Sequence, residues 1–316
     1  MKHIFVTGGA GFIGSNLIRS LLQNYRVTTI DNFDDFYSRK QKELNLKSLL
    51  AHNNFAFIEG DIRNDQDLEK AKDVDVIIHL AAKAGVRPSI KNPILYQDVN
   101  VSGTQTLLEF ARRRGIKQFV FASSSSVYGI NENVPWNEEE KLLPISPYAS
   151  TKLSGEMLGH VYSKLYGIRF LALRFFTVYG PGQRPDLAIH KFFRSILNDE
   201  PIPVFGDGST SRDYTFVQDT VKGVMAAVEY DKSDFEIINL GNHKTVTLAE
   251  LITAIENKCG KKAVISRLPE QPGDVPRTYA DIAKAETLLN YHPATTLNDG
   301  LQSFYDWYIK NSNQLV

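Results

Sequence analysis

Short apolar runs alternate with longer helical patterns over the first two-thirds of this 316-residue chain. Each run is rich in β-branched and aromatic residues and lacks the polar–apolar alternation of a half-exposed strand. Continuous apolar runs of this kind are typical of parallel strands that are buried on both faces. The six runs are His3–Val6, Val27–Ile30, Phe55–Ile58, Val76–His79, Gln118–Ala122 and Arg169–Leu173.

Helical patterns fill the gaps between these runs. Repetition of strand, helix and strand predicts a doubly wound parallel sheet with right-handed crossovers, and therefore an α/β fold of the Rossmann type. The helices are expected at about Phe12–Gln23, Ser38–Ala51, Asp65–Ala71, Leu95–Arg113 and Pro147–Leu165.

The character of the sequence changes after Phe175. Glycine- and proline-rich turns such as 180–185 and 201–203 interrupt short strands and helices. We therefore expect a first domain over 1–175 and a smaller, mixed α/β substrate lobe over 176–316, interleaved because no long flexible linker separates them. Ligands of such sheets bind beyond the carboxyl ends of the strands, where a second lobe could close over them.

Composition excludes several classes of function. Lys+Arg and Asp+Glu each number 36, so no overall field favours nucleic acid or a membrane surface. A single cysteine, Cys259, rules out an internal disulfide framework and argues against a cysteine-based metal site; we expect no metal. No apolar run approaches the roughly 20 residues of a membrane span, so a cytoplasmic location is expected.

The first predicted strand leads directly into a glycine-rich string that opens the first helix. In this context Gly8 permits a tight turn, Gly11 lets the main chain approach a pyrophosphate, and Gly14 allows close helix–strand packing. An ordinary turn before a helix is the alternative. We assign a dinucleotide site, with the helix N-terminus facing the phosphates. The string reads Gly8-Gly9-Ala10-Gly11-Phe12-Ile13-Gly14.

Asp31 ends the second predicted strand, where a carboxylate can accept hydrogen bonds from the adenosine ribose hydroxyls. A 2′-phosphate would face this negative charge, and the next arginine, Arg39, lies in the following segment. The sequence therefore favours NAD over NADP, with Asn32 in the same site.

Two further strand ends are candidates for cofactor contacts. Asp61 and Ile62 follow the third predicted strand and could reach the adenine, although Asp61 could equally cap a short helix. Ala81 and Ala82 follow the fourth strand and are small where the main chain would run beside the cofactor.

Tyr148 and Lys152 stand four residues apart and so share one helix face. A tyrosine phenol has a pKa of roughly 10, which a nearby ammonium and an oxidised nicotinamide would lower, making it a usable base. The pair alone occurs about once by chance in such a chain. Ser124, at the end of the preceding strand, supports the assignment, although a serine run is also common in loops and caps.

The order of these strings resembles the extended short-chain dehydrogenase/reductase family, and within it the nucleotide-sugar epimerases. The resemblance covers essentially the whole chain. It implies that Arg212 and Arg277 hold a nucleotide diphosphate, since arginine bonds phosphate oxygens in pairs, although a surface salt bridge is the alternative for either. Other matching strings are Asn100–Thr104, Leu173–Phe176, Tyr179–Pro181, Phe205–Gly208, Arg212–Tyr214 and Gly273-Asp274.

Two strings, Ala84–Arg87 and Phe176–Asp186, resemble the UDP-glucuronate 4-epimerases. This resemblance implies that Arg184, with Thr177, binds the C6 carboxylate of a UDP-uronic acid. The chain departs from the usual pattern at Lys83, Ser124 and Leu187, and Lys83 has no evident purpose. The resemblance also implies cofactor contacts by Lys83 and Asn100 and substrate contacts by Val86, Arg87, Ser125, Ser126, Ala188, Val204, Phe205 and Asp274.

The expected reaction interconverts UDP-glucuronate and UDP-galacturonate. Tyr148 takes the C4 hydroxyl proton while C4 is oxidised, the 4-keto sugar turns over in its pocket, and reduction on the other face follows. The keto intermediate is a β-keto acid that can lose CO2, so Arg184 and Thr177 are expected to hold the C5–C6 bond away from the reactive orientation.

Several alternatives remain open at this point. A UDP-glucuronate decarboxylase and a UDP-glucose/galactose 4-epimerase share the fold, and a non-catalytic NAD-binding module is a different class. A 4,6-dehydratase would need an Asp-Glu pair where Ser125 and Ser126 stand. Family resemblance also implies a homodimer formed through the helices at Leu95–Arg113 and Pro147–Leu165.

Overall fold

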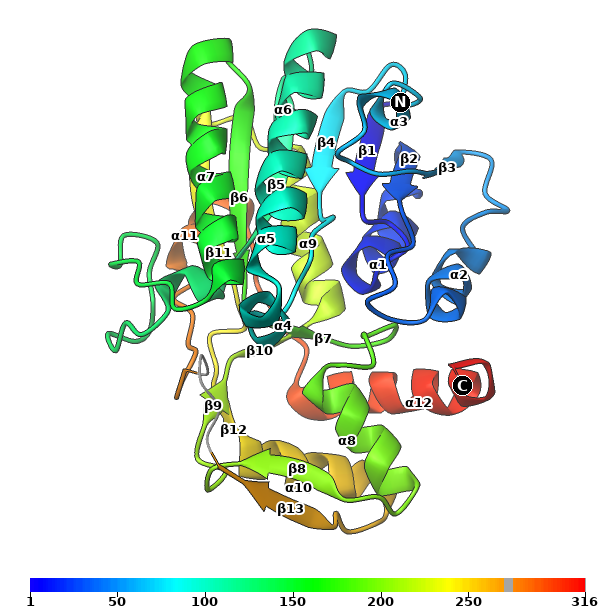
Figure 1. The fold of residues 1–316 in the computed structure, drawn as a ribbon, viewed down its shortest axis with the longest axis vertical. Helices are drawn as coiled ribbons and strands as arrows, with labels where there is room; N and C mark the ends of the chain where they lie inside the picture. The colour runs from blue at the N-terminus through cyan, green and yellow to red at the C-terminus, as the bar shows by residue number, and fades with distance from the viewer. Residues whose placement is uncertain (270–274, 316) are drawn as a thin grey trace.

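The computed structural model describes residues 1–269 and 275–315. Its main sheet has seven parallel strands in the order β11-β6-β5-β4-β1-β2-β3 (Figure 1). The predicted doubly wound parallel sheet is thus confirmed. The strands are β1 (His3–Thr7), β2 (Arg26–Asp31), β3 (Phe55–Glu59), β4 (Val76–His79), β5 (Gln118–Ser124), β6 (Arg169–Phe175) and β11 (Phe235–Leu240).

One strand of this sheet was not predicted. β11 pairs with β6 over its whole length, although it lies some 60 residues beyond it in the chain. The large sheet therefore takes a strand from the region expected to form the second lobe. The division of the chain at 175/176 into two domains stays a prediction.

Apolar side chains of each strand alternate between two layers of helices. Phe5 packs with α6 (Gly103–Arg114) and α7 (Pro147–Tyr166) on one face. Ile4 and Val6 belong to the cluster on the other face, where α1 (Phe12–Leu21) and α9 (Val217–Val228) contact each other. Both faces of the sheet are therefore buried, which explains the continuous apolar runs in the sequence.

The helix expected over Leu95–Arg113 is interrupted. A π-helical turn at Asp98–Ser102 joins α5 (Pro93–Gln97) to α6, and the Thr104 hydroxyl donates to the Asn100 carbonyl at 2.6 Å. The smaller remaining helices near the sheet are α2 (Arg39–Lys47), α3 (Asp65–Leu68), α4 (Val86–Lys91) and α11 (Ala283–Leu289).

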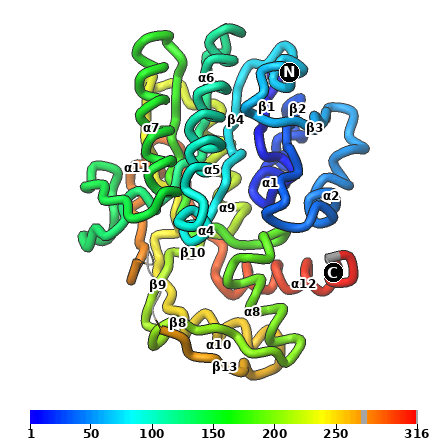
Figure 2. The backbone as a smooth tube through the Cα atoms, in the orientation of Figure 1, coloured from blue at the N-terminus to red at the C-terminus, as the bar shows by residue number. Residues whose placement is uncertain are grey.

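A smaller lobe lies beyond the carboxyl ends of the sheet (Figures 1 and 2). Its strands pair two by two, one pair antiparallel and the others parallel, which fits the mixed α/β lobe expected. The pairs are β7 (Thr177–Tyr179) with β10 (Tyr214–Phe216), β8 (Ile202–Phe205) with β13 (Ile265–Leu268), and β9 (Ser211–Arg212) with β12 (Val246–Thr247); the helices are α8 (Ala188–Leu197), α10 (Leu248–Cys259) and α12 (Leu297–Leu315).

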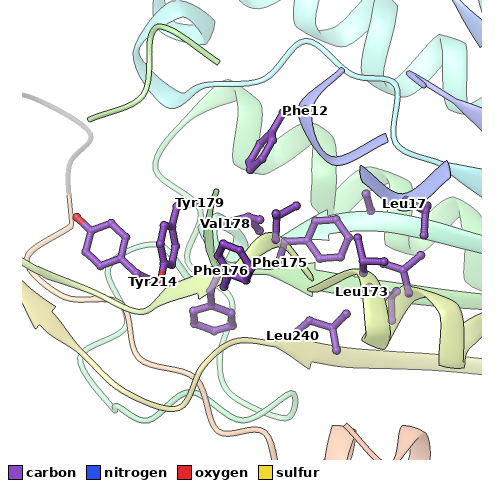
Figure 3. Packing of buried hydrophobic residues seen from close by; sticks show 14 of the residues in the cluster. Phe12, Leu17, Leu173, Phe175, Phe176, Val178, Tyr179, Tyr214 and Leu240 are labelled. Atoms are coloured by element: carbon purple, nitrogen blue, oxygen red, sulfur yellow. The ribbon is translucent and has the colours of Figure 1, made fainter. Parts of the chain in front are cut away.

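The hydrophobic core continues from the sheet into this lobe. Leu173 and Phe175 on β6 lie in the same cluster as Val178, Tyr179 and Tyr214 on the β7–β10 pair (Figure 3). Because buried side chains bridge the lobes without a break, the lobe is held firmly against the strand ends. Among the described residues, no helix is long and apolar enough to cross a membrane.

Candidate active site

A cavity of about 1080 Å³ opens at the carboxyl ends of the strands and extends into the smaller lobe. This volume is at the upper end of the range for small-molecule sites, as two large ligands side by side require. The predicted site residues that line it are Gly8, Gly11, Phe12, Ile13, Gly14, Asp31, Asn32, Asp61, Ile62, Ala81, Ala82, Lys83, Val86, Arg87, Ser124, Ser126, Tyr148, Lys152, Thr177, Arg184, Ala188, Phe205 and Arg212.

The glycine-rich turn is closely packed. Gly8 has φ +75°, and a Cβ at this position would lie 2.9 Å from the main chain of Ala81. A Cβ on Gly14 would lie 2.3 Å from the Gly8 carbonyl oxygen. Neither position can accept a side chain without displacing main-chain atoms, so the turn keeps the N-terminus of α1 open to the cavity.

Asp31 sits at the end of β2 with its carboxylate directed at the glycine turn. It accepts hydrogen bonds from the main-chain N–H groups of Ala10, at 3.1 Å, and Phe33, at 2.9 Å. Burial raises the pKa of this carboxyl, while Lys42, whose Nζ lies 3.9 Å from Oδ1, opposes that rise. These bonds fix the Asp31 carboxylate at the edge of the cavity, and its predicted contact with the adenosine ribose stays a prediction.

Lys42 lines the cavity but is not predicted from the sequence. It is buried on α2 and donates to the Asp34 carbonyl at 2.7 Å. Burial lowers the pKa of its ammonium. A lysine in a helix rich in charged residues gives no sequence signal, because only the fold turns its side chain inward.

Asp61 and Asn32 line the cavity and are joined by a hydrogen bond. Asn32 Nδ2 donates to Asp61 Oδ2 at 3.0 Å, and the Arg63 side chain donates to both oxygens of Asp61. Arg63 holds the pKa of Asp61 at about 2 against the effect of burial. Asp61 is not the cap of α3; that helix is capped by Asn64, whose side chain accepts from the Gln66 N–H.

Lys83 lines the cavity, whereas Asn100 lies behind it. Lys83 Nζ forms an ion pair with Asp34 at 2.7 Å, which ties the loop after β4 to the loop after β2. Asn100 lies outside the cavity lining and uses its side chain on the main chain of Lys83, accepting at 2.8 Å and donating at 2.9 Å. This geometry corrects the expected direct contact of Asn100: it shapes the cofactor pocket from behind.

The tyrosine–lysine pair lies at the start of α7. Ser146 caps this helix by accepting from the Ala149 N–H at 3.1 Å, and Pro147 occupies its first turn. Lys152 is buried, donates to the Ala122 carbonyl at 2.7 Å and lies 5.9 Å from the centre of the Tyr148 ring. The shared helix face predicted for the two residues is therefore observed.

Ser124 ends β5 and faces the same part of the cavity. Its hydroxyl accepts from the Ser126 N–H at 3.1 Å and so caps the short 3₁₀ turn at Ser125–Tyr128. The same hydroxyl donates to Ser126 Oγ at 3.1 Å, and its proximity to the Tyr148 phenol lowers the pKa of that phenol. Ser124 thus serves both as a cap and as a cavity-lining hydroxyl, the two uses that the sequence left open.

Charges around the phenol decide when it can release its proton. Burial raises the pKa of Tyr148, whereas the hydrogen bond from Ser124 and the charge of Arg184 lower it. Burial also lowers the pKa of Lys152 to about 8, opposed by Glu156. Without a cofactor the phenol is therefore protonated at neutral pH, and deprotonation depends on a further positive charge in the cavity.

Arg184 reaches the cavity already paired. Its Nε and Nη2 atoms donate to the two carboxylate oxygens of Asp186 at 2.9 and 2.8 Å, and its guanidinium lies 5.1 Å from the centre of the Phe36 ring. The pairing holds the pKa of Asp186 below its usual range despite burial. A substrate carboxylate would meet the Nη1 side of this fork, so Asp186 is a site residue that the motif comparison overlooked.

The expected phosphate clamp is only partly assembled. Arg212 lines the cavity, and its Nη1 donates to the Ser211 carbonyl at 2.8 Å. Arg277 is exposed and outside the lining, although its main chain bridges to Ser211. Asp274 lies outside the described residues.

Two other residues predicted to contact the substrate, Val204 and Ser125, lie outside the cavity lining. Val204 is buried in the core of the small lobe, and its neighbours Pro203 and Phe205 line the cavity instead. Successive strand residues face opposite sides, so a one-residue difference decides which side chain reaches the ligand. Ser125 is likewise buried and turned away from the lining, whereas Ser126 belongs to it.

Comparison with known proteins agrees with this geometry. A family model described as GDP-mannose 4,6 dehydratase matches residues 5–304. The chain belongs to the extended short-chain dehydrogenase/reductase family. Among relatives in this family, a UDP-glucuronate 4-epimerase from Thermodesulfobacterium geofontis is 40% identical over 98% of this chain and 97% of its own.

Solved structures of the family superpose along the whole chain. UDP-glucuronic acid 4-epimerase from Bacillus cereus, in complex with UDP-glucuronic acid and NAD, has a TM-score of 0.93 and 42% identity, and the match covers 98% of this chain and 99% of that one. A UDP-glucose 4-epimerase from Thermotoga maritima, solved with UDP-glucose, has a TM-score of 0.90 and 32% identity, covering 98% and 99%.

Proposed function

We propose that this protein is a UDP-glucuronate 4-epimerase, an NAD-dependent isomerase that interconverts UDP-glucuronate and UDP-galacturonate. One observation supports the choice of sugar most strongly. The Arg184 guanidinium lines the same cavity as Tyr148, and its positive charge lowers the pKa of the Tyr148 phenol. A fixed cation beside the proton-transferring group suits a sugar that bears a carboxylate close to the reacting carbon. The similarity to UDP-glucuronate 4-epimerases supports the same choice.

The residues present fit NAD. The turn at Gly8 leaves room for a pyrophosphate at the N-terminus of α1, and Asp31 faces the position of the adenosine ribose. Lys42 stands beside Asp31 and supplies a second polar contact for the ribose. When bound, NAD supplies the reversible oxidant and the positive charge of its nicotinamide.

Tyr148 moves the proton of the substrate's C4 hydroxyl. The phenolate forms only while positive charge surrounds it, and Arg184 and the buried Lys152 contribute to that charge. Ser124 lowers the pKa of the phenol, and its hydroxyl, which donates to Ser126 in the structure, would turn to the substrate hydroxyl and fix its direction. After oxidation, the same phenol returns a proton to the oxygen of the inverted sugar, so Tyr148 ends each turnover as it began.

Arg184 also controls a side reaction. The 4-keto sugar of a uronic acid is a β-keto acid, which loses CO2 when the C5–C6 bond stands perpendicular to the carbonyl plane. A guanidinium held on one edge by Asp186 fixes the carboxylate through its other edge and keeps this bond away from the reactive orientation. Weak fixation would convert an epimerase into a decarboxylase.

The test is product analysis without added cofactor. The purified protein is incubated with UDP-glucuronate and, separately, with UDP-glucose, and products are separated by anion exchange and weighed by mass spectrometry. We expect UDP-galacturonate of unchanged mass from the first incubation. A product lighter by CO2 would indicate a decarboxylase, and turnover of UDP-glucose alone would indicate a hexose epimerase. No turnover of either sugar, even after NAD is added, would indicate a non-catalytic module.

We also propose that the protein forms a homodimer and is located in the cytoplasm. Apolar side chains on α7 are exposed, with Met157, Val161 and Leu165 spaced at four-residue intervals along one face. Pairing of two copies through this helix would cover them. The single cysteine, Cys259, is free, which is compatible with a reducing compartment.

A further inference from the structure

The most deeply buried charged group in the large lobe lies behind the active site. Glu156, on α7 one turn beyond Lys152, has no solvent exposure, and Arg174, on β6, is 1% exposed. Arg174 Nε and Nη2 donate to the two carboxylate oxygens of Glu156, both at 2.9 Å. Burying such a pair costs about as much as it returns, so stability alone does not explain it.

Glu156 has a second partner, which connects it to the catalytic residues. The Ser123 hydroxyl donates to Glu156 Oε1 at 2.5 Å, and Ser123 directly precedes Ser124 at the end of β5. One carboxylate therefore joins α7, which carries Tyr148 and Lys152, to the strand end that carries Ser124.

The position of α7 along the sheet is set by very close packing. A Cβ on Gly155 would lie 2.4 Å from the Phe121 ring, and one on Gly159 would lie 2.2 Å from the Phe170 ring. The helix thus rests directly on aromatic rings of β5 and β6, and contacts of this kind have little directional preference. Two directional contacts join the helix to β5: Lys152 donates to the Ala122 carbonyl, and Glu156 accepts from Ser123 beside the catalytic strand end.

We propose that Glu156, bonded to Ser123 and Arg174, is a positioning residue that sets the distance between Ser124 and Tyr148. The inference rests on the proposed function, since it assumes that these two hydroxyls act together on the substrate. It assigns catalytic importance to Glu156, which lies outside the cavity lining, and to Ser123, which lines the cavity but donates its hydroxyl to Glu156.

The test uses two variants of equal size at Ser123. Ser123→Thr keeps the hydroxyl and Ser123→Val replaces it with a methyl group, so any crowding is the same in both. We expect Ser123→Val to lower kcat by about ten- to a hundredfold. KM and the NAD retained by the purified protein should change less than twofold, and Ser123→Thr should restore kcat. Ser123→Ala adds no atoms and should behave as the valine variant.

Tyr128→Phe is the matched control. It removes a hydroxyl that accepts from Arg174 Nη1 at 2.9 Å, at the other end of the same network, and donates to Asn239 at 2.7 Å. The contact between Ser123 and Glu156 stays in place. Tyr128→Phe should lower the thermal midpoint as much as Ser123→Val does, without lowering kcat. Equal kcat for the valine and threonine variants, or an equal loss of kcat in Tyr128→Phe, would overturn the inference.

This outcome is separate from that of the proposed function. The kinetics are measured on whichever nucleotide sugar the parent protein turns over. Failure of the parent to convert UDP-glucuronate would count against the proposed substrate, whereas the ratio between the valine and threonine variants reports on positioning alone.

Discussion

Lys152 shows how the site holds a charge at the expense of stability. The residue is 4% exposed, and the pKa of its ammonium is lowered from 10.5 to about 8 by burial. The folded protein therefore binds this proton more weakly than the unfolded chain does, and the protonated lysine destabilises the fold below pH 8.

Replacing this lysine should stabilise the protein while it abolishes turnover. The lowered pKa corresponds to about 3 kcal/mol at pH 7, of which loss of the bond to Ala122 offsets about 1 kcal/mol. We expect Lys152→Met to raise the free energy of unfolding by about 2 kcal/mol at pH 7. Because the penalty fades as pH rises from 8 to 10.5, urea titrations should show the difference shrinking across that window. A variant less stable than the parent at pH 7 would show that the lysine is not held under this penalty.

Tyr148→Phe removes only the phenolic hydroxyl. The ring packs edge-on against Tyr96 at 6.4 Å, so the variant should fold normally. Loss of the group that moves the proton should lower kcat by about a thousandfold with NAD retention unchanged. Steady-state kinetics and the NAD content of the purified variant check this. A variant that keeps a tenth of the parent's kcat would assign the proton transfer to another group.

At the scale of single residues, the sequence predicts positions next to strand ends well. Gly8, Asp31 and Ser124 follow apolar runs, and their side chains or turns have nowhere to face except the cavity. Lys42 could not be predicted in the same way, because its burial depends on elements distant in the chain. Asp186 pairs with Arg184 two residues before it, and an acidic residue in such a turn has no distinctive sequence pattern.

At the scale of elements, the position of α7, which carries the catalytic residues, depends on two glycines. Gly155 and Gly159 allow α7 to lie directly on Phe121 and Phe170. A glycine within a helix costs up to about 1 kcal/mol relative to alanine, so its presence twice on one face reflects the need for close approach.

Adding a single methyl group tests this packing. Gly155→Ala would place Cβ 2.4 Å from Phe121 Cζ, and either the helix or the ring must move. We expect the free energy of unfolding to fall by about 1–3 kcal/mol and kcat to fall as well. Ser154→Ala, the neighbouring control, loses only a bond to the Ser150 carbonyl and should change stability by less than about 0.5 kcal/mol. A Gly155→Ala protein as stable and active as the control would mean that the helix has room to spare.

Elements were predicted where periodicity is strong and missed where it is broken. All six predicted strands lie in the main sheet, because buried parallel strands have continuous apolar sequences. β11 is not predicted by this pattern because Glu236 and Asn239 interrupt its apolar run. The Asn239 side chain accepts from the Tyr128 hydroxyl and donates to the Trp136 carbonyl. The π-helical turn at Asp98–Ser102 has no sequence pattern of its own, so one long helix was expected.

At the scale of the molecule, the exposed face of α7 is the proposed dimer interface. Met157, Val161 and Leu165 are 48%, 46% and 67% exposed, an unusual concentration for one helix. Their stripe lies on the opposite side of α7 from the buried Glu156, so an interface there would support the catalytic helix from outside.

Charge placed in this stripe should separate the subunits. We expect the parent to sediment as a dimer and the double variant Val161→Glu, Leu165→Glu to sediment as a monomer, because two buried carboxylates would lack partners. Leu50→Glu is the control, since Leu50 is 59% exposed and lies outside α7. A monomeric parent at micromolar concentration, or a Leu50→Glu variant that also dissociates, would place the contact elsewhere or exclude it.

The central claim is that one ring carbon is oxidised and then reduced on its other face within a single binding event. UDP-glucuronate carrying deuterium at C4 tests it in one measurement, the mass of the UDP-galacturonate formed in ordinary water without added cofactor. The account predicts a product that keeps its deuterium and its carboxylate. A product that has exchanged the label with solvent would contradict it.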